Sequence, residues 1–546
     1  MITRFKTLCC GLLLGLLAAP ALAADAARLV STDWLAKNLN RPDLVLIDAS
    51  PTPMYTQQHI AGAVNADFFA YGPQEPTAAQ SEQRFQSWGV GPGKTIVVYD
   101  QGGSYLATRV FFDLLYRGVP AEQLHVLDGG LAKWTASGQP VTKDPTPPPA
   151  AGSFRVTRAL EELRVRLPEF LVASGDPKGH ALIEALEPSY HYGEAAFFDR
   201  AGHVPYARMM PAGDFFNADK TFKAPSEIRR MLDHLGIQPE QQVHIYCGGG
   251  IAASVPFFAV KFLAGYPQVR LYQESQLEWL RDERGLPLWT YSAPYLLREA
   301  PWLKGWAGPA ARMYGISRVS IVDVRAPDVY RLGHLPYALN VPAELFAKHL
   351  KEPQRLAELL GDAGVDPTHE AVVIADGGLT EQSALAFLAL ERLGQQRVSV
   401  LLPSTERWAE LGHEVAREPT VVGPKKAPTD LAVPRVRYTT AAPRGQALVA
   451  DPQRTPGRYP KVFVASGKNA PARPPEGTVV HLPYTSLLAA DGQPKPAKDL
   501  WKALAKAGVP RYAEVVVFGD TVGEAAVNYV LLKLMGYADV KVWSPS

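Results

Sequence analysis

The sequence predicts an α/β protein made of four tandem copies of one unit, each a mainly parallel sheet flanked by helices on both faces. Short β-branched runs alternate with amphipathic helix patterns along the chain, and this alternation is typical of parallel sheets. A glycine-containing turn closes a helix pattern four times, at residues 89–92, 236–239, 364–367 and 508–510. Each turn leads into an apolar run, at residues 95–99, 243–246, 371–374 and 514–518. Self-similarity of this kind indicates repeated domains.

A further strand and a turn stand near the beginning of each copy. In the first three copies the strand includes an acidic residue and lies at residues 45–48, 181–184 and 320–325, the last of which ends at Arg325. The turns that follow contain His59, His203 and His334. The fourth copy matches this part least well, at residues 447–451 and 479–483. The last strand of each copy is accompanied by a tryptophan: Trp134, Trp279, Trp408 and Trp543.

Domain boundaries follow from these copies and from the joints between them. We place the domains at residues 24–145, 153–292, 310–418 and 434–546. Proline-rich joints precede the second and fourth domains, which is typical of linkers. The segment between the second and third domains is rich in aromatic side chains, so we expect it to pack on a domain face. These side chains are Trp289, Tyr291, Tyr295, Trp302 and Trp306.

Residues 1–23 read as a secretory signal peptide. Arg4 and Lys6 precede an apolar run at 12–19, and 21–23 form an Ala-Leu-Ala cleavage site. The apolar run is too short to cross a bilayer, so we expect cleavage after Ala23, no membrane span afterwards, and a periplasmic or secreted protein. Removing the signal leaves 54 basic and 54 acidic residues. This balance gives no general attraction to nucleic acid.

Cys247 is the candidate nucleophile. The chain has three cysteines, and Cys9 and Cys10 fall in the signal, so an exported chain would keep Cys247 alone and form no internal disulfide. A glycine-rich loop between a strand and a helix aims backbone N–H groups at whatever it holds, and such a cradle lowers a thiol pKa. The loop consists of Cys247, Gly248, Gly249, Gly250, Ile251, Ala252, Ala253 and Ser254. The corresponding positions of the other copies, eleven residues after the recurrent glycine, are Asp100, Ala375 and Gly519.

The cysteine loop and the repeated strand and turn resemble the rhodanese superfamily of sulfurtransferases. The Cys-Gly-x-Gly spelling is most similar to the mercaptopyruvate sulfurtransferase branch. The resemblance implies four rhodanese-like domains, of which the second is catalytic, the first and third are inactive, and the fourth is degenerate. It also implies that Cys247 carries a persulfide, cradled by the loop from Gly248 to Ser254, between a small sulfur donor and a thiol, cyanide or protein acceptor. No cofactor or metal is implied.

The donor is left open between thiosulfate, 3-mercaptopyruvate and a persulfide. Thiosulfate-preferring rhodaneses have cationic side chains in the loop, whereas this loop has glycines. The family's Asp-x-Arg element reads Glu184-Ala185-Leu186 here, so the substrate arginine is missing. Candidates to replace it are Arg200, Arg208 and His203 near the second turn, and Arg109 of the first domain. The favoured alternative is a solvated surface position for Arg200 and Arg208 and a structural hydrogen bond for His203.

Three functions remain in competition. The first is a sulfurtransferase, the second a sulfur-carrier or redox protein without appreciable turnover, and the third a partner-binding scaffold, with the third and fourth domains as a possible docking tandem. A phosphatase of the same fold needs an arginine six positions after the cysteine, where this chain has Ala253, so that reading is rejected.

Overall fold

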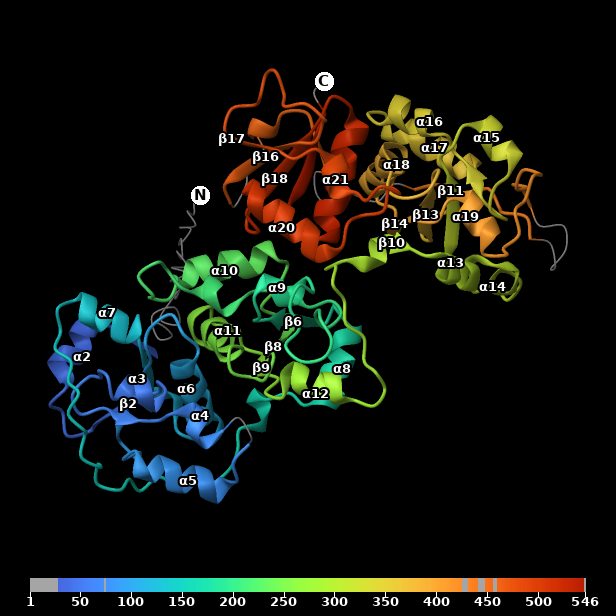
Figure 1. Ribbon diagram of the computed structural model, residues 1–546. Helices are drawn as coiled ribbons and strands as arrows, with labels where there is room; N and C mark the ends of the chain where they lie inside the picture. Colours follow the sequence, from blue (N-terminus) through green and yellow to red (C-terminus); the bar gives the residue numbers. More distant parts are fainter. Residues whose placement is uncertain (1–27, 73–74, 425–430, 440–446, 455–458, 545–546) are drawn as a thin grey trace, which may run out of the picture. The chain divides into compact units, whose positions relative to one another are not determined.

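The computed structural model describes residues 28–72, 75–424, 431–439, 447–454 and 459–544 (Figure 1). The predicted signal peptide and its cleavage site lie outside the described residues. Within the described part of the chain, no helix is long and apolar enough to cross a membrane.

The first repeat forms a five-stranded parallel sheet in the order β1-β5-β4-β2-β3. Its strands are β1 (Leu29–Val30), β2 (Leu44–Asp48), β3 (Val64–Asn65), β4 (Thr95–Tyr99) and β5 (Leu124–Leu127). Its helices are α2 (Thr32–Asn38), α3 (Thr52–Tyr55), α4 (Phe68–Tyr71), α5 (Ala78–Ser87), α6 (Leu106–Tyr116) and α7 (Gly130–Ala136).

The second repeat contains the strand that ends at Cys247. Strand β6 pairs in parallel with β7 on one side and β8 on the other. The strands are β6 (His180–Glu184), β7 (Arg208–Met209), β8 (Gln242–Tyr246) and β9 (Val269–Leu271). The helices are α8 (Leu167–Gly175), α9 (Pro188–His191), α10 (Pro225–His234), α11 (Ser254–Phe258) and α12 (Ser275–Arg281).

The third repeat has the sheet order β10-β14-β13-β11-β12, which is the order of the first repeat. Its strands are β10 (Leu297–Arg298), β11 (Val319–Asp323), β12 (Leu339–Asn340), β13 (Glu370–Ile374) and β14 (Arg397–Leu401). The helices are α13 (Ala300–Ala307), α14 (Pro309–Met313), α15 (Pro327–Leu332), α16 (Ala343–His349), α17 (Pro353–Asp362), α18 (Glu381–Arg392) and α19 (Thr405–Glu410).

The fourth repeat keeps this topology although its sequence motifs are weak. Its sheet has the equivalent order β15-β19-β18-β16-β17. The strands are β15 (Leu448–Val449), β16 (Lys461–Ala465), β17 (Thr478–His481), β18 (Glu514–Phe518) and β19 (Val540–Trp543), and the described helices include α20 (Ala497–Ala507) and α21 (Val522–Leu534).

Successive side chains of a strand enter separate cores, as expected for a sheet covered on both faces. In the third repeat, Ile321 and Val372 belong to one buried cluster, whereas their neighbours Val322 and Val373 belong to another. The central strands are therefore apolar on both faces, which explains the continuous β-branched runs in the sequence. The α/β class and the repeated parallel sheets are confirmed.

The chain divides into two compact units. Among the described residues, the first comprises those up to 164 together with 212–229 and 251–271, and the second comprises 165–211, 230–250 and those from 272 onward. The division passes through the second repeat and between Gly250 and Ile251 of the cysteine loop.

Each unit contains one pairing of helices from neighbouring repeats. In the first unit α6 packs on α11, where the buried rings of Phe111 and Phe258 meet edge to face with centroids 5.0 Å apart. In the second unit α18 packs on α21, where Lys533 of α21 donates to Glu391 of α18 at 2.6 Å. Because these helices follow the cysteine loop or its counterparts, the first and second repeats pair through the same helix as the third and fourth.

The aromatic segment between the second and third repeats packs against the second unit, as predicted. The Tyr291 hydroxyl donates to the Lys495 carbonyl at 2.8 Å, and the Ala293 amide donates to the Leu534 carbonyl at 3.1 Å. Both acceptors belong to the fourth repeat. The segment therefore ties the second repeat to the fourth within this unit.

Candidate active site around Cys247

Cys247 stands at the carboxyl end of β8, held by its own backbone. Its amide donates to Ser275 Oγ at 3.0 Å, and its carbonyl accepts from the Gln276 amide at 3.1 Å. Its side chain is buried, with 2% exposure. Ser275 and Gln276 begin α12, so the first turn of this helix fixes the position of the cysteine.

The thiol sulfur receives one short backbone hydrogen bond. Gly250 N–H donates to Cys247 Sγ at 3.1 Å. The Ser275 hydroxyl lies 4.0 Å from the same sulfur, but it is 2.7 Å from the Tyr272 carbonyl, which is the stronger acceptor. Ser275 has a left-handed backbone with φ 55°, a conformation that L side chains rarely adopt and that occurs most often at functional sites.

Two of the loop glycines are needed for close packing. Gly250 has φ 79°, and a Cβ there would lie 2.0 Å from the Gln273 carbonyl oxygen. A Cβ on Gly248 would lie 2.5 Å from the ring of Phe197. Gly249 faces open space. The loop therefore admits a side chain at its middle glycine, admits one at Gly248 when the Phe197 ring moves, and is blocked by backbone at Gly250.

The rest of the loop, from Ile251 to Ser254, belongs to the first unit. The Ser254 amide donates to the Ile251 carbonyl at 3.0 Å, and its hydroxyl donates to the same oxygen at 2.7 Å. That hydroxyl is also 2.8 Å from Thr108 Oγ1 of α6. Both polar groups of Ser254 are thus engaged in the protein, and this residue starts α11 instead of facing a ligand.

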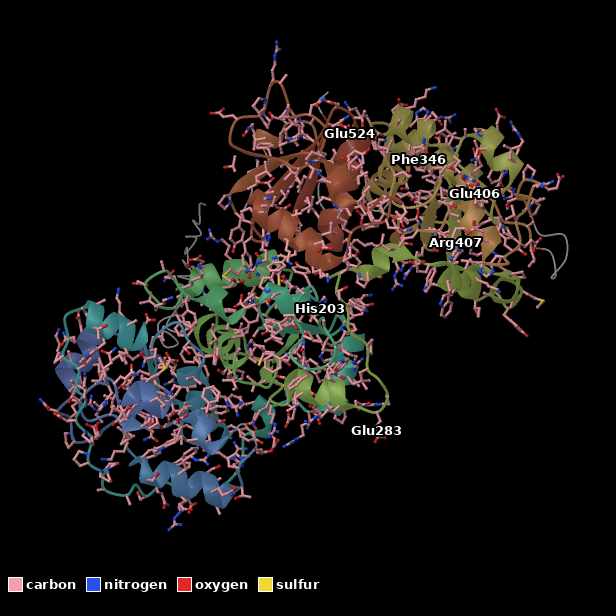
Figure 2. The ribbon with its side chains drawn as sticks, viewed as in Figure 1. His203, Glu283, Phe346, Glu406, Arg407 and Glu524 are labelled. Atoms are coloured by element: carbon pink, nitrogen blue, oxygen red, sulfur yellow. The ribbon has the colours of Figure 1, made fainter. Side chains whose placement is uncertain are left out.

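Behind the loop lies a fully buried polar cluster of Glu184, His191, His203 and Gln276 (Figure 2 labels His203). Glu184 Oε2 is 2.6 Å from His191 Nδ1, and Glu184 Oε1 accepts from Gln276 Nε2 at 3.0 Å. The same Gln276 amide donates to the Gly202 carbonyl at 2.9 Å. Because the Gln276 backbone holds the Cys247 carbonyl, the cluster connects directly to the cysteine.

Gln276 makes hydrogen bonds equivalent to those that an arginine makes in the third repeat. There the Arg325 guanidinium donates to Asp323 Oδ2 at 2.6 Å and to the Gly333 carbonyl at 3.0 Å. Asp323 and Gly333 occupy the positions of Glu184 and Gly202. The missing arginine of the Asp-x-Arg element is therefore replaced structurally by an amide from α12.

His191 takes the position of a tyrosine in the first and third repeats. Tyr55 and Tyr330 follow the strand-end aspartates by seven residues, as His191 follows Glu184. Each stacks on the histidine of its turn, with ring centroids 3.9 Å apart for Tyr55, 3.8 Å for Tyr330 and 3.5 Å for His191. Unlike those tyrosines, which donate to turn carbonyls, His191 bonds to the acid.

Burial favours the neutral forms of the titratable members of the cluster. Burial raises the pKa of Glu184 to about 7 and lowers the pKa of His191 and of His203 to about 3. Ser292 donates to the Met535 carbonyl at 3.2 Å, so its oxygen accepts from His191 Nε2–H at 3.1 Å. His191 Nδ1 is then an acceptor, and the proton of the short bond belongs to the Glu184 carboxyl.

Glu184, His191 and His203 offer ligand atoms within 4.8 Å of one another, an arrangement that sequence spacing did not predict. The two imidazole planes are parallel within 3°, so their in-plane lone pairs run side by side instead of converging on one ion. His203 Nδ1–H donates to the His191 carbonyl at 2.8 Å, as His59 does to Tyr55 in the first repeat at 2.9 Å. The geometry fits a structural stack better than a metal centre.

The predicted substrate arginines are engaged elsewhere. Arg200 donates to the Leu286 carbonyl at 2.9 Å and so stabilises the loop after α12. Arg208 donates from Nε to the Leu235 carbonyl at 2.8 Å, at the outer strand β7. In the first unit, buried Arg109 pairs with Asp113 at 3.1 Å and lies over the Phe68 ring.

Sequence reasoning missed Phe197, which lies against the loop. His203 follows His191 by twelve positions, whereas His59 follows Tyr55 by four, so the second repeat has an eight-residue insertion at this turn. The insertion includes Phe197, which is 44% exposed and packs against Gly248. Counting the spacing between these repeated positions would have revealed it.

Comparisons with known proteins identify the family. A family model for the rhodanese-like domain matches residues 31–137 and 308–411, the first and third repeats. A probable 3-mercaptopyruvate sulfurtransferase of Pseudomonas aeruginosa is 30% identical over 281 residues, 48% of this chain and 97% of that protein. The sulfur carrier protein TtuD of Thermus thermophilus is 29% identical over 270 residues, 46% of this chain and 93% of that protein.

Among solved structures, SseA from Escherichia coli, described as a 3-mercaptopyruvate sulfotransferase, is 25% identical. It covers 45% of this chain and 98% of its own length, with a TM-score of 0.42. The sequence relatives, together with four parallel sheets and a strand-end cysteine loop, establish that the chain belongs to the rhodanese superfamily of sulfurtransferases.

Proposed function

We propose that the protein transfers sulfane sulfur through a persulfide on Cys247. The observation that carries this proposal is the position of Cys247, the one free cysteine of the described residues, at a strand end with Gly250 N–H donating to its sulfur. A backbone donor at this position stabilises negative charge on sulfur, as an oxyanion hole does on oxygen. Asp100 and Ala375 stand at the equivalent positions of the first and third repeats, so those repeats have no nucleophile.

The reaction consists of two displacements. The Cys247 thiolate attacks the outer sulfur of the donor, a new S–S bond forms, and the donor's bond to that sulfur breaks with its electron pair leaving on the donor remnant. A nucleophilic acceptor then attacks the outer sulfur of the persulfide, and the Cys247 thiolate departs with the electron pair of the S–S bond. Splitting one transfer into two steps is the advantage of covalent catalysis.

The surroundings of Cys247 favour an organic sulfur donor, such as an organic persulfide, over a small oxoanion such as thiosulfate. Of the predicted substrate arginines of the second repeat, Arg200 donates to the Leu286 carbonyl, and Arg208 lines a cavity whose lining does not include Cys247. The side chain nearest the loop at Gly248 is the aromatic Phe197. A face of this kind contacts an organic group more favourably than a sulfonate.

A sulfur carrier with little turnover is the second candidate. The 2% exposure of Cys247 favours it, because a covered sulfur reacts when a partner opens the site. The Thermus relative is named as a sulfur carrier. We further propose that the chain is exported. We also propose that its third and fourth repeats act together as a docking tandem, and the packing of α18 on α21 supports their pairing.

Measuring the rate of sulfur transfer with several donors and acceptors tests this proposal. The mature protein and its Cys247→Ser variant are incubated with thiosulfate, 3-mercaptopyruvate or glutathione persulfide, each with cyanide or dithiothreitol as acceptor. We expect Cys247-dependent turnover with glutathione persulfide above that with thiosulfate. Single-turnover loading without continued product release would favour the carrier, and equal rates in the serine variant would overturn both.

A further inference from the structure

We propose that a cavity in the second unit, apart from Cys247, is a binding site for a planar organic anion. The cavity has a volume of about 790 Å³ and is bordered by the second repeat, the aromatic segment after it, and the third and fourth repeats. This volume is within the range of small-molecule sites. Cys247 is not among the residues that line it, so this proposal does not depend on sulfur chemistry.

Positive charge dominates the lining. The cationic residues are Arg208, Arg298, Arg397, Arg511 and Lys533. The two acidic residues of the lining are already paired: Glu370 accepts from Arg298 Nε at 2.7 Å and Nη2 at 3.0 Å, and Glu391 accepts from Lys533 at 2.6 Å. Among the described lining residues, the cations exceed the carboxylates, and an anionic ligand would restore the balance.

Arg208 and Arg397 are the guanidinium groups best placed to hold the ligand's charge. Arg208 comes from β7 and Arg397 begins β14, so two repeats contribute them to one cavity. Burial raises the pKa of Tyr295, and the positive charges of Arg208 and Arg397 oppose that rise, so both lie within electrostatic reach of its phenol. A planar guanidinium binds carboxylate or phosphate oxygens in pairs.

Beside these cations stands a group of three aromatic rings. Tyr206 meets Trp289 with centroids 4.7 Å apart and Tyr295 at 6.0 Å, and all three line the cavity. Tyr206 is 37% exposed and Tyr295 is 43% exposed, so their rings are incompletely covered by protein. Exposed rings in a concave site offer surfaces on which a planar ligand can stack.

The backbone of Tyr206 has the conformation of the repeated turn and fixes the position of its ring. Tyr206 has φ 63°, a left-handed conformation that glycine adopts without strain. Gly62 with φ 81° and Tyr337 with φ 65° occupy the equivalent turn positions of the first and third repeats, so the second repeat has an aromatic ring where the first has glycine. The adjacent ring surface and cations therefore specify an aromatic or heteroaromatic body bearing a carboxylate or phosphate.

Isothermal titration of the full mature chain tests the proposal. The probes are 2-naphthoate and 2-naphthyl phosphate, with 2-naphthylmethanol as the uncharged analogue. We expect one saturable site for at least one anion and at least tenfold weaker binding of the alcohol. The tighter of the two anions identifies the ligand's charged group.

Three variants locate the site. Arg397→Gln and Arg208→Gln should each weaken anion binding at least fivefold, and Tyr206→Gly should weaken it while leaving the thermal midpoint unchanged or raised. Arg407→Gln, on α19 (Figure 2) and not among the residues that line the cavity, is the matched control and should bind like the parent. Absence of saturable binding, equal affinity for the alcohol, or full affinity in Arg397→Gln would overturn the proposal.

Discussion

Glu184 Oε2 lies 2.6 Å from His191 Nδ1, inside the repeat that contains Cys247. The first and third repeats have an aspartate and a tyrosine at these positions, and the tyrosines bond elsewhere. The acid–histidine pair is therefore a local feature of the cysteine-containing repeat. Through Gln276 it reaches the Cys247 carbonyl, so the pair supports the geometry of the loop.

The protonation of Glu184 gives a prediction about pH. Burial raises its pKa from 4.5 to about 7. A raised pKa stabilises the fold fully below the unfolded value, and this contribution is lost as pH rises through the folded value. Gln at 184 mimics the protonated carboxyl without titrating, so the stability advantage of the parent over Glu184→Gln should fall by about 3 kcal/mol between about pH 4.5 and pH 8.

Urea unfolding of both proteins across this pH range measures the difference. The titrations of His191 and His203 occur in both proteins and cancel to first order. Glu283→Gln, at an exposed position (Figure 2), is the control and should show no such trend. A constant difference between parent and Glu184→Gln would show that Glu184 is ionised throughout.

Gln276 should matter for both stability and sulfur transfer. Gln276→Met leaves Glu184 Oε1 and the Gly202 carbonyl buried without this donor, at an expected cost of about 1–3 kcal/mol. The loop should loosen as well, because Gln276 begins the helix that holds the Cys247 backbone. Urea midpoints and the rate of Cys247 alkylation measure the two effects, and the exposed Gln238→Met should change neither. If Gln276→Met is destabilised but its Cys247 is alkylated at the same rate as in the parent, the polar cluster does not control the reactivity of Cys247.

The loop glycines provide a matched pair of substitutions. Gly248→Ala would place a Cβ 2.5 Å from the Phe197 ring, whereas Gly249→Ala meets nothing within 4 Å. We expect Gly248→Ala to displace Phe197 and reduce sulfur loading of Cys247 several-fold, and Gly249→Ala to behave like the parent. Adding Phe197→Ala to Gly248→Ala should restore loading. Equal effects of the two alanines would contradict the packing described here.

Arg325 should be purely structural, although it matches the family's arginine position. It donates to Asp323 and to the Gly333 carbonyl, and it is buried. Removing one member of a buried ion pair typically costs about 3–5 kcal/mol. Arg325→Leu should therefore destabilise the third repeat by that amount, measured by urea unfolding, and leave sulfur loading of Cys247 unchanged. If Arg325→Leu is as stable as the parent but its Cys247 takes up less sulfur, the third repeat takes part in sulfur transfer.

The sequence was sufficient for the architecture because its periodicity is local. Buried parallel strands such as β18 need apolar side chains on both faces, so they appear as continuous runs even where motifs are lost. The fourth repeat was the weakest match by motif, yet its strand order equals that of the first. Topology is set by hydrophobic patterning, which tolerates the loss of individual turn residues.

The polar cluster could not be read in the same way. Gln276 and Glu184 are 92 positions apart, and nothing local marks an amide as the substitute for a missing arginine. The position of His191 could have been predicted from the sequence, because its seven-residue spacing from Glu184 repeats that of Tyr55 from Asp48. The packing of Phe197 on Gly248 depends on the path of an insertion, which no periodicity specifies.

The most direct test of a persulfide at Cys247 is the intact mass of the protein after incubation with glutathione persulfide and removal of excess donor. A persulfide at Cys247 predicts a gain of one sulfur atom per chain, lost on adding cyanide, localised to the peptide containing Cys247, and absent in Cys247→Ser. An unchanged mass with this donor, thiosulfate and 3-mercaptopyruvate alike, in a protein whose Cys247 can still be alkylated, would contradict it.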